Sequence, residues 1–244
     1  MAYSVPLYIA AAKIDDPTLR YVWDDTRASQ DFQYSSDWVV EALAPTTLRA
    51  RIAAGLGIYE WIACRFRSVS PDPLPFQVVE GGWCANAHRD YMRYFELDRG
   101  EWLGPIRGPL WCATTWLLPL IFFSDEKPAE WRSGIRYLTS LAMHILPETT
   151  AFEDWLRACI GRMTTLFVQP PQDPFEDLFR EREEERRGAL ISKDVLDPRL
   201  DYRPELGPAL VARYLRSADF QLNPFLQGQG GGSWPRNTSS RYSL

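Results

Sequence analysis

One apolar stripe runs along residues 46–66, TTLRARIAAGLGIYEWIACRF. Its apolar members recur every three or four residues, which is the spacing of one face of an α-helix. The members of the stripe are Leu48, Ile52, Leu56, Tyr59, Ile62 and Phe66. The prolines at 71, 73 and 75 end this helix, because proline cannot continue it. The charged residues on the opposite side, where we expect solvent, are Arg49, Glu60 and Arg67.

Helical signals continue on the C-terminal side of this stretch, between breaks rich in proline and glycine. Gly81 and Gly82 predict the start of the next helix. The further predicted helices cover about 83–97, 109–123, 131–145, 152–167 and a last stretch from Pro208. We therefore predict an all-α fold, either an irregular helical bundle or stacked helical hairpins, with five to seven helices.

Composition divides the chain into three parts. Residues 1–43 are mixed and are expected to form a less regular N-terminal segment packed on the core. Residues 44–223 are expected to form the helical domain, with a charge-dense segment at 173–187 on its surface. Residues 224–244 are rich in glycine and serine and are expected to form a flexible tail.

The bulk composition narrows the class of partner. The chain has 244 residues and a formal net charge of −5, and this acidic balance argues against a general nucleic-acid binder. The first residues, MAYSVP, lack the basic and apolar regions of a secretory signal. Four cysteines without a CxxC pair predict reduced thiols in the core. We therefore expect a cytoplasmic protein.

The sequence contains no complete catalytic motif. His88, Arg89 and Asp90 reproduce one short kinase string, but the other kinase motifs are missing. Cys84 and His88 are one helical turn apart and would both face one metal ion, although structural zinc sites show further paired ligands. We predict no catalytic residue, no metal site and no cofactor, and the metal binding of the Cys84/His88 pair stays open.

Tryptophan and arginine are both in excess. The chain has 10 tryptophans, and its 27 basic residues are 24 arginines and 3 lysines. Aromatic residues and arginine dominate the hot spots of protein interfaces, and they alternate closely between residues 89 and 102. The predicted binding residues are Trp23, Trp83, Arg89, Arg93, Arg99 and Trp102.

The tryptophans fall into two groups by their sequence context. Those within predicted helices are expected in the core, and they are Trp61, Trp83, Trp111, Trp116, Trp131 and Trp155. Those in irregular or terminal segments are expected at the surface, and they are Trp23, Trp38, Trp102 and Trp234. Trp83 is therefore a candidate for both roles.

Three functions fit these patterns. The favoured one is a non-enzymatic protein–protein interaction protein, such as an adaptor, an inhibitor or an immunity-type protein. Its partner would be another protein rather than a nucleic acid or a membrane, and its oligomeric state stays open. The first alternative is an enzyme whose scattered site combines His88 and Asp90 with Glu60 and Arg93. The second is membrane association through the uncharged stretch 108–124.

Overall fold

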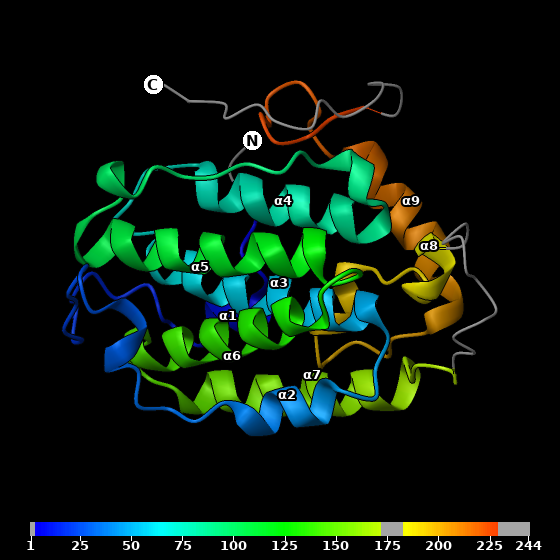
Figure 1. Cartoon of the computed structure of the whole chain (residues 1–244), viewed down its shortest axis with the longest axis horizontal. Coiled ribbons are helices and arrows are strands. Elements are labelled where there is room, and N and C mark those ends of the chain that lie inside the picture. The colour runs from blue at the N-terminus through cyan, green and yellow to red at the C-terminus, as the bar shows by residue number, and fades with distance from the viewer. Residues whose placement is uncertain (1–2, 172–182, 229–244) are drawn as a thin grey trace.

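The computed structural model describes residues 3–171 and 183–228, and their regular elements are helical (Figure 1). These residues contain no strand beyond two isolated β-bridges. The all-α prediction is confirmed. The α-helices are α1 (Leu7–Ala11), α2 (Asp37–Leu43), α3 (Leu48–Arg65), α4 (Leu74–Ala87), α5 (Gly104–Phe123), α6 (Pro128–Ile145), α7 (Thr150–Leu166), α8 (Glu183–Arg186) and α9 (Gly207–Ser217). The short 3₁₀ helices are η1 (Ala28–Asp31), η2 (Arg89–Tyr91), η3 (Arg99–Glu101), η4 (Lys193–Leu196) and η5 (Pro204–Leu206).

Helix α3 is the central helix of the bundle. It packs against α4, α5, α6 and α7, and α5 lies between α4 and α6 (Figure 1). Seventeen of its eighteen residues are buried. The expectation that Arg49 and Glu60 face solvent is wrong, because they are only 5% and 2% exposed. Neighbouring helices cover α3 on all sides, so its polar side is buried together with its apolar stripe.

Backbone carbonyls from distant segments accept hydrogen bonds from the first amides of α3. The Thr47 amide donates to the Phe167 carbonyl at 2.8 Å, and the Arg49 amide donates to the Arg187 carbonyl at 3.0 Å. No side chain caps this helix. The first amides of a helix have no partner inside it, so these two tertiary bonds replace a side-chain cap.

Helix α4 differs from the predicted helix over 83–97. It begins nine residues earlier, at Leu74, and ends at Ala87, after which the chain continues through η2 into an extended segment. Gly81 and Gly82 lie inside the helix rather than at its start. A Cβ atom on Gly82 would lie 2.3 Å from a methyl carbon of Leu56, so this glycine permits close packing of α4 on α3.

The expected boundaries of the charged segment and the tail also need correction. Arg187, at the end of the charged segment, is only 1% exposed and lies in the core rather than on the surface. Phe225 and Leu226 are buried, and the Phe225 carbonyl accepts from the Arg93 amide at 2.9 Å. The Gln227 amide also donates to the Tyr91 carbonyl at 2.9 Å, so the packed chain extends to residue 227. Residues 172–182 and 229–244, including Trp234, lie outside the described residues.

Candidate protein-binding surface

The six predicted binding residues do not form one surface. Trp83 and Trp102 are only 4% and 7% exposed, so neither indole is available to a partner, and the expected exposure of Trp102 is wrong. Arg89 and Arg93 follow the end of α4. The three that gather at the start of α5 are Trp23, Arg99 and Trp102. The candidate surface is therefore sought at this end of the bundle.

Asp25 joins the N-terminal segment to the start of α5. One of its carboxylate oxygens accepts from Trp23 Nε1 at 2.8 Å, and the other accepts from the Gly104 amide at 2.9 Å. Gly104 has φ +85°, a conformation that favours glycine. A Cβ atom on Gly108 would lie 2.3 Å from Trp23 Nε1, so only a glycine admits the indole at this distance. These contacts fix Trp23 against α5.

Two arginines at the same end of the bundle lie over tryptophan rings. The Arg99 guanidinium carbon is 5.5 Å from the centre of the Trp111 ring, and that of Arg107 is 5.5 Å from the centre of the Trp102 ring. Both guanidiniums also donate to backbone carbonyls, Arg99 to Asp25 and Arg107 to Glu101. Cation–π contact and hydrogen bonding together hold these cations in place at the surface.

Two exposed apolar residues lie in the segments that meet at the start of α5. Val22 and Leu103 are 78% and 52% exposed. The Tyr21 hydroxyl donates to the Pro105 carbonyl, so the segment that carries Val22 reaches the first turn of α5, and the Val22 carbonyl lies 2.9 Å from His144 Nε2 of α6. We name Val22, Trp23, Arg99, Leu103 and Arg107 the α5-start surface.

A groove adjoins the α5-start surface. It has a volume of about 470 Å³. The residues that line it are Val69, Ser70, Pro71, Asp72, Pro73, Ile106 and Arg107. Arg107 and Asp72 approach to 4.0 Å and form an ion pair in a groove whose lining is otherwise largely apolar.

Sequence reasoning missed Val22, Leu103 and Arg107. All three lie in or next to irregular segments, where no periodic pattern predicts which residues are exposed. The Gly104-Pro105 pair is a signal for a helix start. Placing α5 from that pair would have put Leu103 and Arg107 at its N-terminal end.

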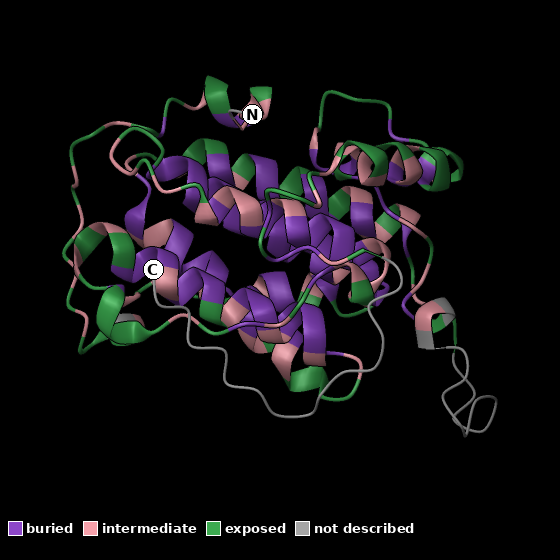
Figure 2. Ribbon diagram, turned by 90° about the horizontal axis from the view of Figure 1, so that it is seen from above, coloured by how far each residue is buried: buried purple, intermediate pink, exposed green. Residues whose placement is uncertain are grey.

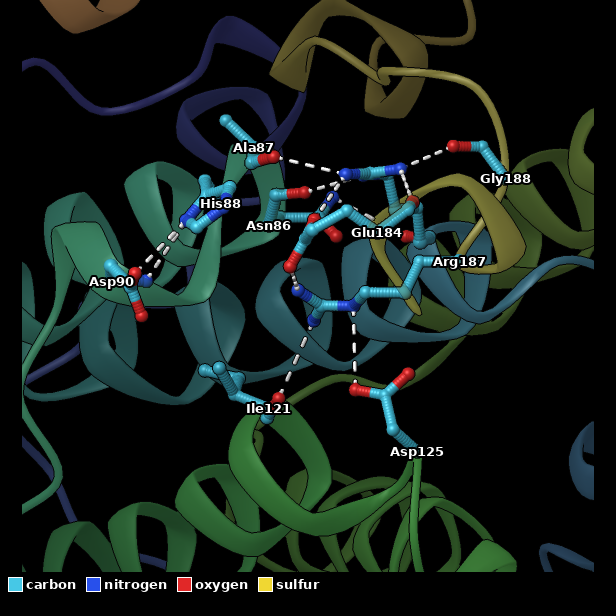
Figure 3. Close-up of polar contacts among 10 residues, drawn as sticks. Asn86, Ala87, His88, Asp90, Ile121, Asp125, Glu184, Arg187 and Gly188 are labelled. Atoms are coloured by element: carbon cyan, nitrogen blue, oxygen red, sulfur yellow. Dashed lines mark hydrogen bonds and ion pairs between the residues drawn. The ribbon is translucent and has the colours of Figure 1, made fainter. Parts of the chain in front are cut away.

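Glu60 is not brought together with His88 and Asp90, with which it was proposed to form an enzyme site. The His88 ring accepts from the Asp90 amide at 3.3 Å, and the two side chains approach to 3.8 Å within one exposed turn (Figure 3). Glu60 lies instead in the middle of α3, buried in the protein core, where it accepts a hydrogen bond from the Tyr3 hydroxyl. His88 therefore serves as the local cap of η2.

A buried ionic network lies near this turn. Glu184 accepts from Arg49 at 2.7 Å and from Arg187 at 3.1 Å, and Asp125 lies 3.5 Å from Arg187 (Figure 3). Arg49 also donates to the carbonyls of Asn86 and Ala87 at the end of α4. The network fastens residues 183–188 to the ends of α4 and α5, which is a structural role.

Cys84 and His88 are poorly arranged for a metal ion. Burial raises the pKa of the Cys84 thiol to about 12, which disfavours the thiolate that a metal binds. The Cys84 side chain is fully buried, whereas His88 is partly exposed beside Asp90. In the part of the chain that the structure describes, no three His, Cys, Asp or Glu side chains form a group suited to a metal.

Helix α5 is long and apolar enough to cross a membrane by length and composition. Eleven of its twenty residues are buried against the rest of the bundle. The core helix of a soluble protein passes the same test, so the apolar character of α5 is accounted for by its position between α4 and α6.

Comparison with known proteins assigns no family to the chain. No protein-family model matches it, and neither the curated proteins nor the solved structures contain a significant match. Function is therefore inferred from the geometry of the chain itself.

Proposed function

We propose that the protein acts without catalysis by binding another protein through the α5-start surface. One observation carries this proposal: the segments that carry exposed Val22 and Leu103 meet at the start of α5, where two arginines are already held over tryptophan rings. Apolar side chains next to fixed arginines are typical of the centre of protein interfaces. An adaptor, an inhibitor or an immunity-type protein would all use such a surface.

The fixed arginines support binding in a specific way. A free arginine side chain loses about 0.5–1.5 kcal/mol of conformational freedom when a partner immobilises it. Arg99 and Arg107 are ordered before binding by their ring contacts and carbonyl bonds. The partner therefore meets two preorganised cations, which favours a partner that presents carboxylates.

The groove beside Arg107 supports the apolar part of the contact. Its volume of about 470 Å³ suits an apolar side chain of the partner, which would pack on Val69, Pro73 and Ile106. We accordingly propose a partner segment that carries an apolar residue next to an acidic one. We propose that the protein acts in the cytoplasm, where the reducing conditions agree with its four unpaired thiols.

The test compares Leu103→Glu with a matched control. Leu103 is 52% exposed on the α5-start surface, and Leu200 is 46% exposed elsewhere. Both substitutions add one charge at an exposed leucine, so both variants are expected to fold alike. Partners cross-linked to a photoreactive residue at position 22 in the source cells are identified, and their affinity is then measured with purified proteins.

The outcomes separate clearly. Leu103→Glu is expected to weaken binding by about tenfold or more, as for an interface hot spot, whereas Leu200→Glu leaves it unchanged. Equal affinity of both variants for the cross-linked partner, or no cross-linked partner at all, contradicts the proposal.

A further inference from the structure

The first described residues of the chain form a strap across the bundle. Residues 3–14, which we name the N-terminal strap, contain the five-residue helix α1. Figure 2 shows this short helix beside the N label at the edge of the molecule. A helix of one turn has no stability of its own in water. The strap is therefore held by its side-chain contacts with the bundle.

Those contacts combine two buried isoleucines, Ile9 and Ile14, with aromatic stacking. Tyr3 stacks on Phe76, with the ring centres 4.4 Å apart, and Tyr8 stacks on Trp155 at 5.8 Å. Tyr8 also contacts Trp61 at 6.4 Å. The strap thus covers an aromatic surface contributed by α3, α4 and α7.

A carboxyl group lies beneath the strap. Glu60, in the middle of α3, is 2% exposed, and it accepts a hydrogen bond from the Tyr3 hydroxyl. The ionisable groups that face it are Tyr3 and Tyr8 of the strap, Cys64 of α3, Lys193 of η4 and Tyr214 of α9. Lys193 is exposed and lies over the Tyr214 ring, at 5.7 Å from its centre.

Burial makes the charged form of Glu60 unfavourable. Loss of hydration raises the pKa of Glu60, and this outweighs the Tyr3 hydrogen bond and the attraction of Lys193, both of which lower it. Both tyrosines whose hydroxyl groups hydrogen-bond to Glu60 belong to the strap, whereas Tyr214 belongs to α9. Release of the strap would therefore admit water to the carboxyl group and remove the cost of its ionisation.

The boundary of the strap is also suited to release. Lys13 has φ 50°, a left-handed conformation that costs a non-glycine residue about 1–2 kcal/mol. Beyond it the chain is firmly anchored, because Arg65 donates to the carbonyls of Asp16 and Thr18, and Ser68 donates to that of Asp15. Opening can therefore stop at residue 14.

We propose that the N-terminal strap is a pH-dependent lid, which opens when Glu60 gives up its proton to water and thereby uncovers Phe76, Trp61 and Trp155. When the strap is closed, the Glu60 carboxyl group is protonated and neutral. When the strap is open, Glu60 is a hydrated carboxylate.

The sign of the pH dependence follows from linkage. In the open form Glu60 has the ordinary pKa of 4.5, and in the closed form its pKa is raised. The closed strap is thus most stable below pH 4.5, and its stability falls as the pH rises towards the raised pKa. One proton is released per opening, so within this window the opening constant rises by up to about tenfold per pH unit.

Hydrogen exchange of the full chain tests the proposal. Protection of the peptide covering residues 3–14 is measured from pH 5 to pH 9 and corrected for the intrinsic exchange rate at each pH. A peptide covering 131–145 of α6 serves as the internal reference. Protection of the strap is expected to fall with rising pH, while that of the α6 peptide stays constant. A strap whose corrected protection does not change with pH overturns the proposal.

Two variants assign the effect to Glu60. Glu60→Gln keeps the shape and the acceptor oxygen without the charge, so its strap is expected to stay protected at every pH. The control is Glu41→Gln, an exposed carboxyl group on α2, which is expected to behave as the unmodified protein does. A Glu60→Gln strap that opens in parallel with the control overturns the proposal.

A double variant keeps the proposal testable if Glu60→Gln fails to fold. Tyr3→Phe with Tyr8→Phe retains the aromatic stacking but removes both hydroxyl donors. Ionised Glu60 then has no donor from the strap, so loss of protection above pH 7 is expected to exceed that of the unmodified chain. An equal or smaller loss contradicts the assigned role of the two tyrosines and of Glu60.

Discussion

Arginine side chains bind the carbonyl ends of helices in this protein. Arg49 donates to the last carbonyls of α4, and Arg65 donates to the Ile145 carbonyl of α6. Arg51 donates to the last carbonyl of α2 and to the one that follows it. Arg51 also lies over the Trp131 ring at 4.5 Å. A planar guanidinium reaches several carbonyls and a ring at once, which an ammonium group does not. The excess of arginine over lysine therefore has a structural use.

Arg65→Lys tests this use of arginine. Arg65 is fully buried and donates to three carbonyls, those of Asp16, Thr18 and Ile145. A shorter ammonium group leaves at least one of them without a donor, so we expect a loss of about 2–4 kcal/mol in the free energy of unfolding.

Urea denaturation measures this loss against a matched substitution. Arg20 is paired with Asp16 on the surface, and 64% of its side chain is exposed. Arg20→Lys is expected to change stability by less than about 0.5 kcal/mol. Equal stability of the two variants would show that Arg65 does not depend on its guanidinium geometry.

At the residue level the sequence predicted burial better than exposure. Trp61, Trp131 and Trp155 are buried as their helical stripes indicate. Trp102 lies in an irregular segment and was expected at the surface, but Arg107 lies over its ring and it is 7% exposed. Contacts between residues of different segments decide such positions, and periodicity carries no signal of them. The same limit applies to Val22 on the α5-start surface.

At the scale of elements, ion pairs between side chains attach the short helix α8 to the bundle. Glu184 lies between the guanidiniums of Arg49 and Arg187, whose side chains are 6% and 0% exposed. Among the described side chains, Glu184→Ala leaves Asp125 as the carboxylate that lies near the two buried cations. We expect a loss of about 2–3 kcal/mol, below the 3–5 typical of a fully buried pair because 30% of the Glu184 side chain is exposed.

Thermal unfolding and hydrogen exchange check this expectation. The exposed Glu205 in η5 supplies the control, Glu205→Ala, which is expected to leave the stability unchanged. In Glu184→Ala, amides 184–190 are expected to lose protection first. A variant as stable as the control would mean that the two arginines are satisfied by backbone carbonyls alone.

The elements themselves could be predicted where one face is apolar. Helices α6 and α7 follow the stripes that start at Trp131 and Phe152. Helix α4 could not be placed correctly, because Gly81 and Gly82 are typical of a helix boundary and only their contact with neighbours explains them. Its end at Ala87 is likewise set by a tertiary contact, from Arg49 to the last carbonyls.

At the scale of the whole molecule, the core protects every thiol. The four cysteines are unpaired and buried, and burial raises the pKa of Cys84, Cys112 and Cys159 to about 12 and that of Cys64 further. With Ellman's reagent at pH 8, we expect the folded protein to react at least about a hundredfold more slowly than the chain in urea. The unfolded chain is expected to release four equivalents, and one fast thiol in the folded state would contradict this burial.

The start of α3 has a consequence for synthesis of the chain on the ribosome. Its amides at 47 and 49 bond to carbonyls at 167 and 187, which are translated more than a hundred residues later. At about 5–20 residues per second, this delay lasts about 7–28 s. During that time α3, which is almost entirely buried in the folded protein, lacks both its end contacts, and its neighbours α4 to α7 are still being added. The nascent chain is therefore expected to be a client of chaperones, and slower codons before residue 187 would lengthen that dependence.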